Sequence, residues 1–148
     1  IRLRLHAFGE NVSERDVTEA LTGLCQRRGW SIVNFHIAPR FEPATRPGQL
    51  RGRHEWWVEL KPGTIATPTG PQMAAELDAE LVRTSESYAT RRRSGQLEAP
   101  VVRLVMPGVF EHWLRFRSQW GGQHKVPRCR SDRQVADELA QITNFAID

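Results

Sequence analysis

The chain has 148 residues, a length that suits one domain with a sizeable buried core. Its hydrophobic fraction of 39% and charged fraction of 26% argue against the disordered and fibrous classes of protein. No apolar run reaches the roughly 18 residues that a membrane helix needs, so we expect no membrane partner. The net charge is +4, and the 21 basic residues are nineteen arginines and only two lysines, Lys61 and Lys125. A lysine kept in so arginine-rich a chain indicates a position that needs a compact, mobile ammonium group.

The chain opens on an expected strand. Residues 1–7 alternate polar and apolar side chains, which is the period of a half-buried strand. Residues 9–11 form a turn, after which Ser13 caps a helix with Asp16 as the acid of a capping box. Gly29 ends that helix. Because no cap or turn precedes the first strand, we expect the chain to be a piece of a longer protein.

The next segments predict a hairpin with a long loop. Residues 30–38 alternate and are β-branched, residues 41–53 are rich in proline, glycine and arginine, and residues 54–61 form a third strand. Trp56 and Trp57 lie side by side on that strand and must point to opposite faces of the sheet. We expect one of them in the core and the other available to a partner surface.

The second half of the chain predicts mostly helices. Proline suits the first turn of a helix that we expect over residues 71–93, with Gly95 as its end. Residues 100–107 form a fourth strand, and residues 109–118 form a short helix. Ser131 is predicted to cap the last helix.

The first six expected elements therefore run strand, helix, strand, strand, helix, strand. This order is typical of the ferredoxin-like fold, in which an antiparallel sheet carries both helices on one face. We predict an α+β fold, with residues 1–148 as a single domain: a ferredoxin-like βαββαβ core with an antiparallel sheet, plus two appended C-terminal helices.

The loop at residues 120–128 combines groups that are suited to binding an anion. Its two glycines let backbone N–H groups approach a ligand closely. Lys125 and Arg128 can complement a phosphate, one as a point charge and the other as a planar fork. The composition is equally consistent with a solvated connection between two helices.

The cysteines and histidines predict no metal centre. Cys25 and Cys129 have neither a metal-ligand spacing nor a disulfide framework, so we expect two free thiols in a reducing compartment. His6, His36 and His54 fall on expected neighbouring strands and could converge there. Histidines on a sheet more often face solvent or make local hydrogen bonds, and no zinc-binding motif is present.

The chain carries no complete catalytic set. We find no nucleophile elbow, P-loop, dinucleotide fingerprint or paired catalytic carboxylates. By its residues alone it is an α+β domain with one conspicuous basic loop.

A series of residues from Tyr88 onward has the order and spacing of a known family. The series comprises Tyr88, Arg91 to Arg93, Gly95-Gln96-Leu97, Pro107-Gly108, Phe110 and Gln123 to Arg128. This region resembles the C-terminal region of the auxin-responsive Gretchen Hagen acyl acid amido synthetases, bacterial branch, which belong to the acyl-adenylate-forming superfamily. The turn at Gly9 and Glu10 and the strand HEWWVEL extend a weaker match over nearly the whole chain.

The resemblance implies part of a cytoplasmic ATP-dependent ligase. In this family a large N-terminal domain binds ATP, with Mg²⁺, and an acyl acid, and the C-terminal domain closes on it as a lid. The acid is converted to an acyl-AMP with loss of pyrophosphate, and the amine of an amino acid acceptor then attacks to form an amide. The implied partners are thus the N-terminal domain of the same enzyme, the acyl-AMP intermediate and the amino acid acceptor. We do not expect the isolated domain to be active.

The same resemblance implies roles for the basic loop. Lys125 is the implied catalytic residue, and the implied nucleotide- or phosphate-contacting loop comprises Gly121, Gly122, Gln123, His124 and Arg128. His124 stands where plant members have tyrosine, so the acyl acid does not follow from the plant enzymes. Asn11 stands where superfamily members often place lysine, which leaves the roles of Glu10 and Asn11 open.

A second hypothesis is a free-standing ferredoxin-like binding module. Such a module would dock a partner protein or an anionic ligand such as RNA, in keeping with the basic charge. The aromatic residues do not form paired stacking motifs on central strands, so we do not expect a nucleic acid ligand.

Overall fold

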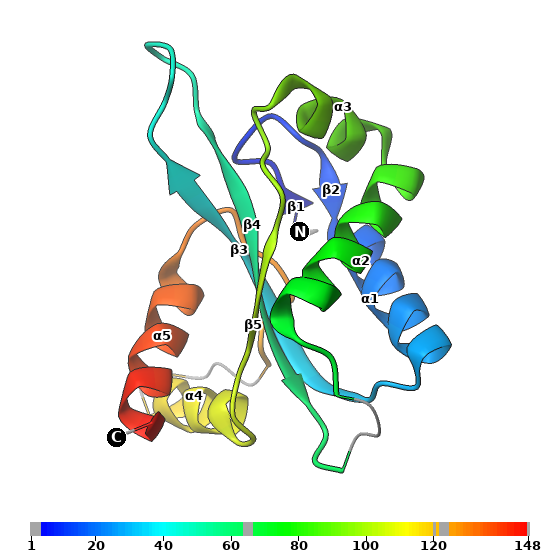
Figure 1. Cartoon of the computed structure of the whole chain (residues 1–148). Coiled ribbons are helices and arrows are strands. Elements are labelled where there is room, and N and C mark those ends of the chain that lie inside the picture. Colours follow the sequence, from blue (N-terminus) through cyan, green and yellow to red (C-terminus); the bar gives the residue numbers. More distant parts are fainter. Residues whose placement is uncertain (1–3, 64–66, 120, 122–124, 148) are drawn as a thin grey trace.

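The computed structural model describes residues 4–63, 67–119, 121 and 125–147, with residues 144–147 described by their backbone alone. It has the predicted α+β class (Figure 1). The main sheet has the order β3-β4-β5 and consists of β3 (Ile32–Glu42), β4 (Arg51–Leu60) and β5 (Val101–Leu104). The helices in the described part of the chain are α1 (Glu14–Arg28), α2 (Gly70–Thr84), α3 (Glu86–Ser94), α4 (Val109–Ser118) and α5 (Gln134–Ile147). None of them is long and apolar enough to cross a membrane.

Helices cover both faces of the main sheet. Figure 1 shows α1 and α2 on one side and the appended helices α4 and α5 on the other. Each side has its own cluster of buried side chains, the first around Trp56 and Leu77 and the second around Trp57 and Trp113. Trp56 and Trp57 are only 0% and 2% exposed, so the expectation that one of them faces a partner is wrong. The reason is that α4 and α5 cover the second face.

Helix α1 begins and ends at the predicted residues. The Ser13 hydroxyl oxygen accepts the Asp16 N–H at 3.1 Å, and the Asp16 carboxylate accepts the Ser13 N–H at 3.1 Å. This confirms the capping box, which typically stabilises a helix by about 1 kcal/mol. Gly29 closes the helix at a φ of 73°, a left-handed conformation that glycine adopts without strain.

The first strand does not join the main sheet. β1 (Arg4–Leu5) pairs with β2 (Val12–Ser13) in a separate antiparallel ribbon. The predicted ferredoxin-like order is wrong at this point, because β5 occupies the edge of β4 that the first strand would need. Leu5 and Phe8 are still part of the core cluster that α1 and α2 share with the main sheet. The β1–β2 ribbon therefore packs against this core without extending the sheet.

Strands β3 and β4 form the predicted hairpin, but they are longer than the sequence indicates. They pair from Ile32 with Leu60 to Glu42 with Arg51, which leaves a connection of residues 43–50. Gly52 makes the pairing possible, because a Cβ there would overlap the Arg40 carbonyl oxygen. Backbone approach of this kind explains why a glycine stands inside a strand.

Strand β5 runs parallel to β4, with Trp56 opposite Val102, and not antiparallel as predicted. The connection through α2 and α3 returns the chain to the same end of the sheet, as a crossover must for parallel strands. The single helix predicted over residues 71–93 is in fact α2 and α3. Between them Ser85 is extended, with φ −123° and ψ 110°, and its hydroxyl accepts the Tyr88 N–H at 3.3 Å.

The last helix begins later than predicted. Ser131 does not cap it, because its hydroxyl donates to the Arg4 carbonyl at 2.9 Å and accepts the His6 N–H at 3.3 Å. Asp132 instead accepts the Gln134 N–H at 3.1 Å. Ser131 therefore ties the start of the chain to the segment before α5.

Candidate functional site

The basic loop lies between α4 and α5. Lys125 is exposed to solvent at the start of a segment that leads into α5. Gly121 has a φ of 118°, which favours glycine. Of the other residues predicted to contact a nucleotide, Gly122, Gln123 and His124 lie outside the described residues.

The backbone that follows Lys125 is fixed to the outer edge of β3. The Ile37 N–H donates to the Arg128 carbonyl at 2.9 Å, and the Arg130 N–H donates to the Ile37 carbonyl at 3.1 Å. Cys129 thereby forms an isolated parallel bridge with Ile37 and is fully buried. Lys125 thus lies four residues before an isolated bridge to the edge strand of the sheet.

Side chains reinforce this attachment on both faces of the sheet. Val126 is buried in the cluster under α4 and α5, and Cys129 is buried in the cluster under α1 and α2. Cys129 and Cys25 are free thiols, as predicted. Burial raises the pKa of Cys25 to about 11 and that of Cys129 to about 12, so both are packing residues and not nucleophiles.

His36 holds the segment from beneath. Its Nδ1 lies 2.6 Å from the Pro127 carbonyl oxygen, and its side chain is fully buried. Burial lowers the pKa of His36 to about 4, so the ring is neutral at pH 7. Since a carbonyl oxygen only accepts, the single ring proton must sit on Nδ1, and Nδ1–H donates to Pro127. Nε2 has no hydrogen-bond partner within the described part of the chain.

Arg128 lies against the first turns of α1. Its Nη1 donates to the Thr18 hydroxyl at 3.0 Å, and its Nε lies 3.8 Å from a Glu14 carboxylate oxygen. The guanidinium also stacks over the Phe35 ring, 5.5 Å from the ring centroid. Its contact with a phosphate stays a prediction, and its observed contacts help fix the segment to α1.

The far end of the segment is held by a buried carboxylate that sequence reasoning missed. Glu55, 1% exposed on β4, accepts from Arg133 Nη2 at 3.1 Å and from Arg103 Nε at 2.9 Å. Trp57 Nε1 also donates to Glu55, at 2.9 Å. Burial alone would raise the pKa of Glu55, but the two guanidinium groups outweigh burial and lower it. The signal in the sequence is that the strand HEWWVEL places two acids, Glu55 and Glu59, among its apolar residues.

Glu59 positions α4. It lies four residues after Glu55, on the same face of β4. Its carboxylate accepts the Gly108 N–H at 3.2 Å and the Phe110 N–H at 3.3 Å. A negative charge at a helix N-terminus is stabilising because it meets the positive end of the helix dipole. Glu55 and Glu59 therefore attach both appended helices to one strand.

A second buried network fixes the turn at residues 9–11. The Glu10 carboxylate, 2% exposed, accepts the Phe8 N–H at 2.8 Å and the His54 Nε2–H at 2.6 Å. Burial alone would raise the pKa of Glu10, but His54 and the Phe8 N–H outweigh burial and lower it. The Asn11 N–H donates to the Ser87 hydroxyl at 3.1 Å, which ties the turn to α3. Glu10 and Asn11 thus have structural contacts in this domain.

The three strand histidines do not converge. His36 lies on the α4/α5 face of the sheet, His54 lies on the opposite face, and His6 is exposed. Across the described ranges, no group of three His, Cys, Asp or Glu residues lies close enough together to hold a metal ion.

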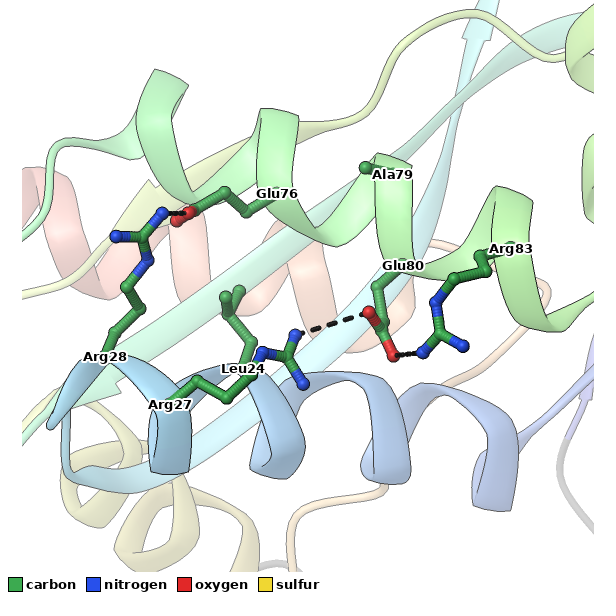
Figure 2. A pocket seen from close by; sticks show the side chains of 7 residues that line it. All are labelled: Leu24, Arg27, Arg28, Glu76, Ala79, Glu80 and Arg83. Atoms are coloured by element: carbon green, nitrogen blue, oxygen red, sulfur yellow. Dashed lines mark hydrogen bonds and ion pairs between the residues drawn. The ribbon is translucent and has the colours of Figure 1, made fainter.

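A groove between α1 and α2 is lined by charged residues (Figure 2). Arg28 pairs with Glu76, while Arg27 and Arg83 reach the two oxygens of Glu80 at 3.3 Å and 2.5 Å. Figure 2 shows that the pairs Arg28–Glu76 and Arg27–Glu80 span the gap from α1 to α2, while Arg83 and Glu80 pair within α2. Because the charges that line the groove are paired with one another, we interpret it as a helix–helix contact and not as a ligand site.

The α+β fold of this chain is similar to part of two solved structures of acyl acid amido synthetases. The structure of "GH3.15 acyl acid amido synthetase" has a TM-score of 0.70 and 17% identity, and the match covers 97% of this chain and 26% of that chain. "AtGH3.15 acyl acid amido synthetase in complex with 2,4-DB" has a TM-score of 0.65 and 18% identity, covering 94% and 25%. This chain therefore spans about a quarter of the length of those proteins.

Residues 15–134 match the GH3 family C-terminal domain, and the chain belongs to this family. No curated protein matches the sequence. The family match confirms the resemblance that starts at Tyr88, while the bacterial branch stays a prediction.

Proposed function

We propose that this chain is the C-terminal lid domain of an ATP-dependent acyl acid amido synthetase. Such an enzyme adenylates a carboxylic acid and transfers the acyl group to the amine of an amino acid. The observation that supports this most directly is the match of residues 15–134 to the family's C-terminal domain. The chain's span of about a quarter of the matched synthetases also suits a domain that works with a larger partner.

Lys125 is the residue of this chain that we assign to the chemistry. When a carboxylate oxygen attacks the α-phosphorus of ATP and pyrophosphate leaves, negative charge accumulates around the reacting phosphate. A positioned ammonium group stabilises that charge more in the transition state than in the ground state. Lys125 is solvent-exposed on a segment whose following residues are fixed to β3, so the domain can present it to another domain.

A lid can deliver and remove this charge between the two half-reactions. Closure brings the ammonium group to the phosphate for adenylation, and opening makes room for the amino acid acceptor. We assign ATP and Mg²⁺ mainly to the N-terminal domain of the same enzyme, since this sequence has no P-loop or dinucleotide fingerprint. The two free, buried thiols fit a cytoplasmic enzyme.

The test combines the mass of the native gene product with its activity in pyrophosphate exchange. We expect the native gene product to be several times heavier than this 16.9 kDa chain, and to catalyse pyrophosphate exchange into ATP that depends on an added carboxylic acid. We expect no exchange from the 148-residue chain alone. A native product of about the mass of this chain would contradict the proposal. It would favour a free-standing module, which salt-dependent binding of RNA or capture of a defined partner protein would then identify.

A further inference from the structure

We propose that His36 is a positioning residue for Lys125: its imidazole holds the Pro127 carbonyl and so sets where the ammonium group is presented. This inference rests on the proposed function of the domain. It assigns to a buried side chain, which sequence reasoning treated only as a possible metal ligand, the task of fixing a catalytic loop.

The position of Pro127 makes its carbonyl the natural place for such a contact. Proline has no N–H, so its carbonyl is the only main-chain group at residue 127 that a hydrogen bond can hold. The next main-chain hydrogen bonds to β3 involve Arg128 and Arg130. Near Lys125, both the buried Val126 side chain and the hydrogen bond from His36 hold the segment.

The chemistry of the histidine fits this task. A neutral ring brings one N–H donor into a fully buried site without bringing a charge. The charged groups that act on the ring are Arg130, Asp132 and Arg133 from the segment before α5, and the two arginines oppose its protonation. Nε2 has no hydrogen-bond partner in the described ranges. An apolar side chain at residue 36 would bury no unpaired nitrogen and would avoid that cost. What histidine offers here and an apolar side chain does not is the N–H donor at Nδ1.

Pro127 is two residues from Lys125. Loss of the hydrogen bond from His36 to Pro127 should therefore change the position of the Lys125 ammonium group. The backbone from Lys125 to Pro127 would gain conformations in which the ammonium group misses the reacting phosphate. A displacement of about 1 Å in a catalytic group can reduce a rate about a hundredfold. Binding of ATP and the acid, which we assign mainly to the other domain, should change little.

The experiment is a double-mutant cycle in the native synthetase, measured by acid-dependent pyrophosphate exchange. H36L fills the space without a donor, H36M is a second donor-free variant with a more adaptable shape, and H36N keeps an amide donor at the place of Nδ1. We expect H36L and H36M to lower kcat about 10- to 100-fold with KM for ATP within about twofold, and H36N to stay within about threefold. We expect the double variant K125A/H36L to be no slower than K125A, because His36 acts only through Lys125.

His54 provides the matched control, since it is a buried histidine on the opposite face of the same sheet. H54L should lower the exchange rate by the same factor with and without K125A. An H36L effect that is equally large in the K125A background, or an H36L enzyme with wild-type kcat, would overturn the positioning role. If K125A itself exchanges at the wild-type rate, the assignment of Lys125 fails as well, and that single variant distinguishes the two failures.

Discussion

Buried polar side chains hold the loops of this domain in place. His36 fixes the segment that follows Lys125, Glu55 fixes the start of α5 through Arg133, and Glu10 fixes the first turn through His54. Each of these groups sits in a region from which water is excluded, so a lost partner leaves a costly unpaired group. The partners are far apart in sequence: 91 residues separate His36 from Pro127, and 78 separate Glu55 from Arg133. No local pattern could have revealed them.

The first residue-scale prediction concerns acid stability. The pKa of His36 is about 4 in the folded protein and about 6.5 when it is unfolded, so protonation favours unfolding. Its contribution is therefore fully present above pH 6.5 and is lost as the pH falls toward 4, by about 3 kcal/mol in all. We expect urea unfolding of this chain to show most of that loss between pH 6.5 and 4.5, and H36N to show little of it. Parallel pH profiles for the two proteins would contradict this account.

The second residue-scale prediction concerns Glu55. E55Q keeps the shape of the side chain but removes the charge that meets Arg103 and Arg133, and we expect it to lower the free energy of unfolding by about 2 kcal/mol. The matched control is E111Q, since Glu111 pairs with Arg115 while both side chains are 67% or more exposed. That change should stay within about 0.5 kcal/mol. Urea unfolding at pH 7 measures both, and equal small losses would show that the Glu55 cluster does not stabilise the domain.

At the scale of the elements, local sequence signals located most of the secondary structure. The capping box of α1, the hairpin of β3 and β4 and the proline in the first turn of α2 all follow from short patterns. The break at Ser85 was missed because the helical period of apolar residues continues on both sides of it. The parallel pairing of β5 was missed because strand direction depends on where a crossover returns, which is a property of packing and not of periodicity.

Glycine substitutions test the element-scale account. G52A places a Cβ onto the Arg40 carbonyl oxygen and 2.6 Å from the Phe8 ring, so we expect it to lower the free energy of unfolding by more than about 2 kcal/mol. G23A is the control, because a Cβ there meets only the end of the Arg27 side chain, at 3.5 Å. As alanine is the better helix former, G23A should stabilise the domain by up to about 1 kcal/mol. If G52A leaves the free energy of unfolding unchanged, β3 and β4 do not approach each other as closely as described.

At the scale of the whole molecule, the order of elements and the family resemblance predicted the α+β class and the two appended helices. The sequence did not reveal that these helices cover the second face of the sheet, where they bury Trp57. The sequence did identify the basic loop. It did not reveal that the segment after this loop is attached to the edge of β3. We propose on this basis that the domain presents Lys125 near the edge of its sheet.

The most direct test of that account compares the two lysines of the chain in the native synthetase. We expect K125A to lower the kcat/KM of acid-dependent pyrophosphate exchange by about 100- to 1,000-fold, as removal of a group that stabilises transition-state charge does. K61A, which removes the other lysine from an exposed position after β4, should stay within about twofold of the wild type. A K125A enzyme that exchanges as fast as the K61A enzyme would contradict the central claim, because the lid would then bring no essential charge to the reaction.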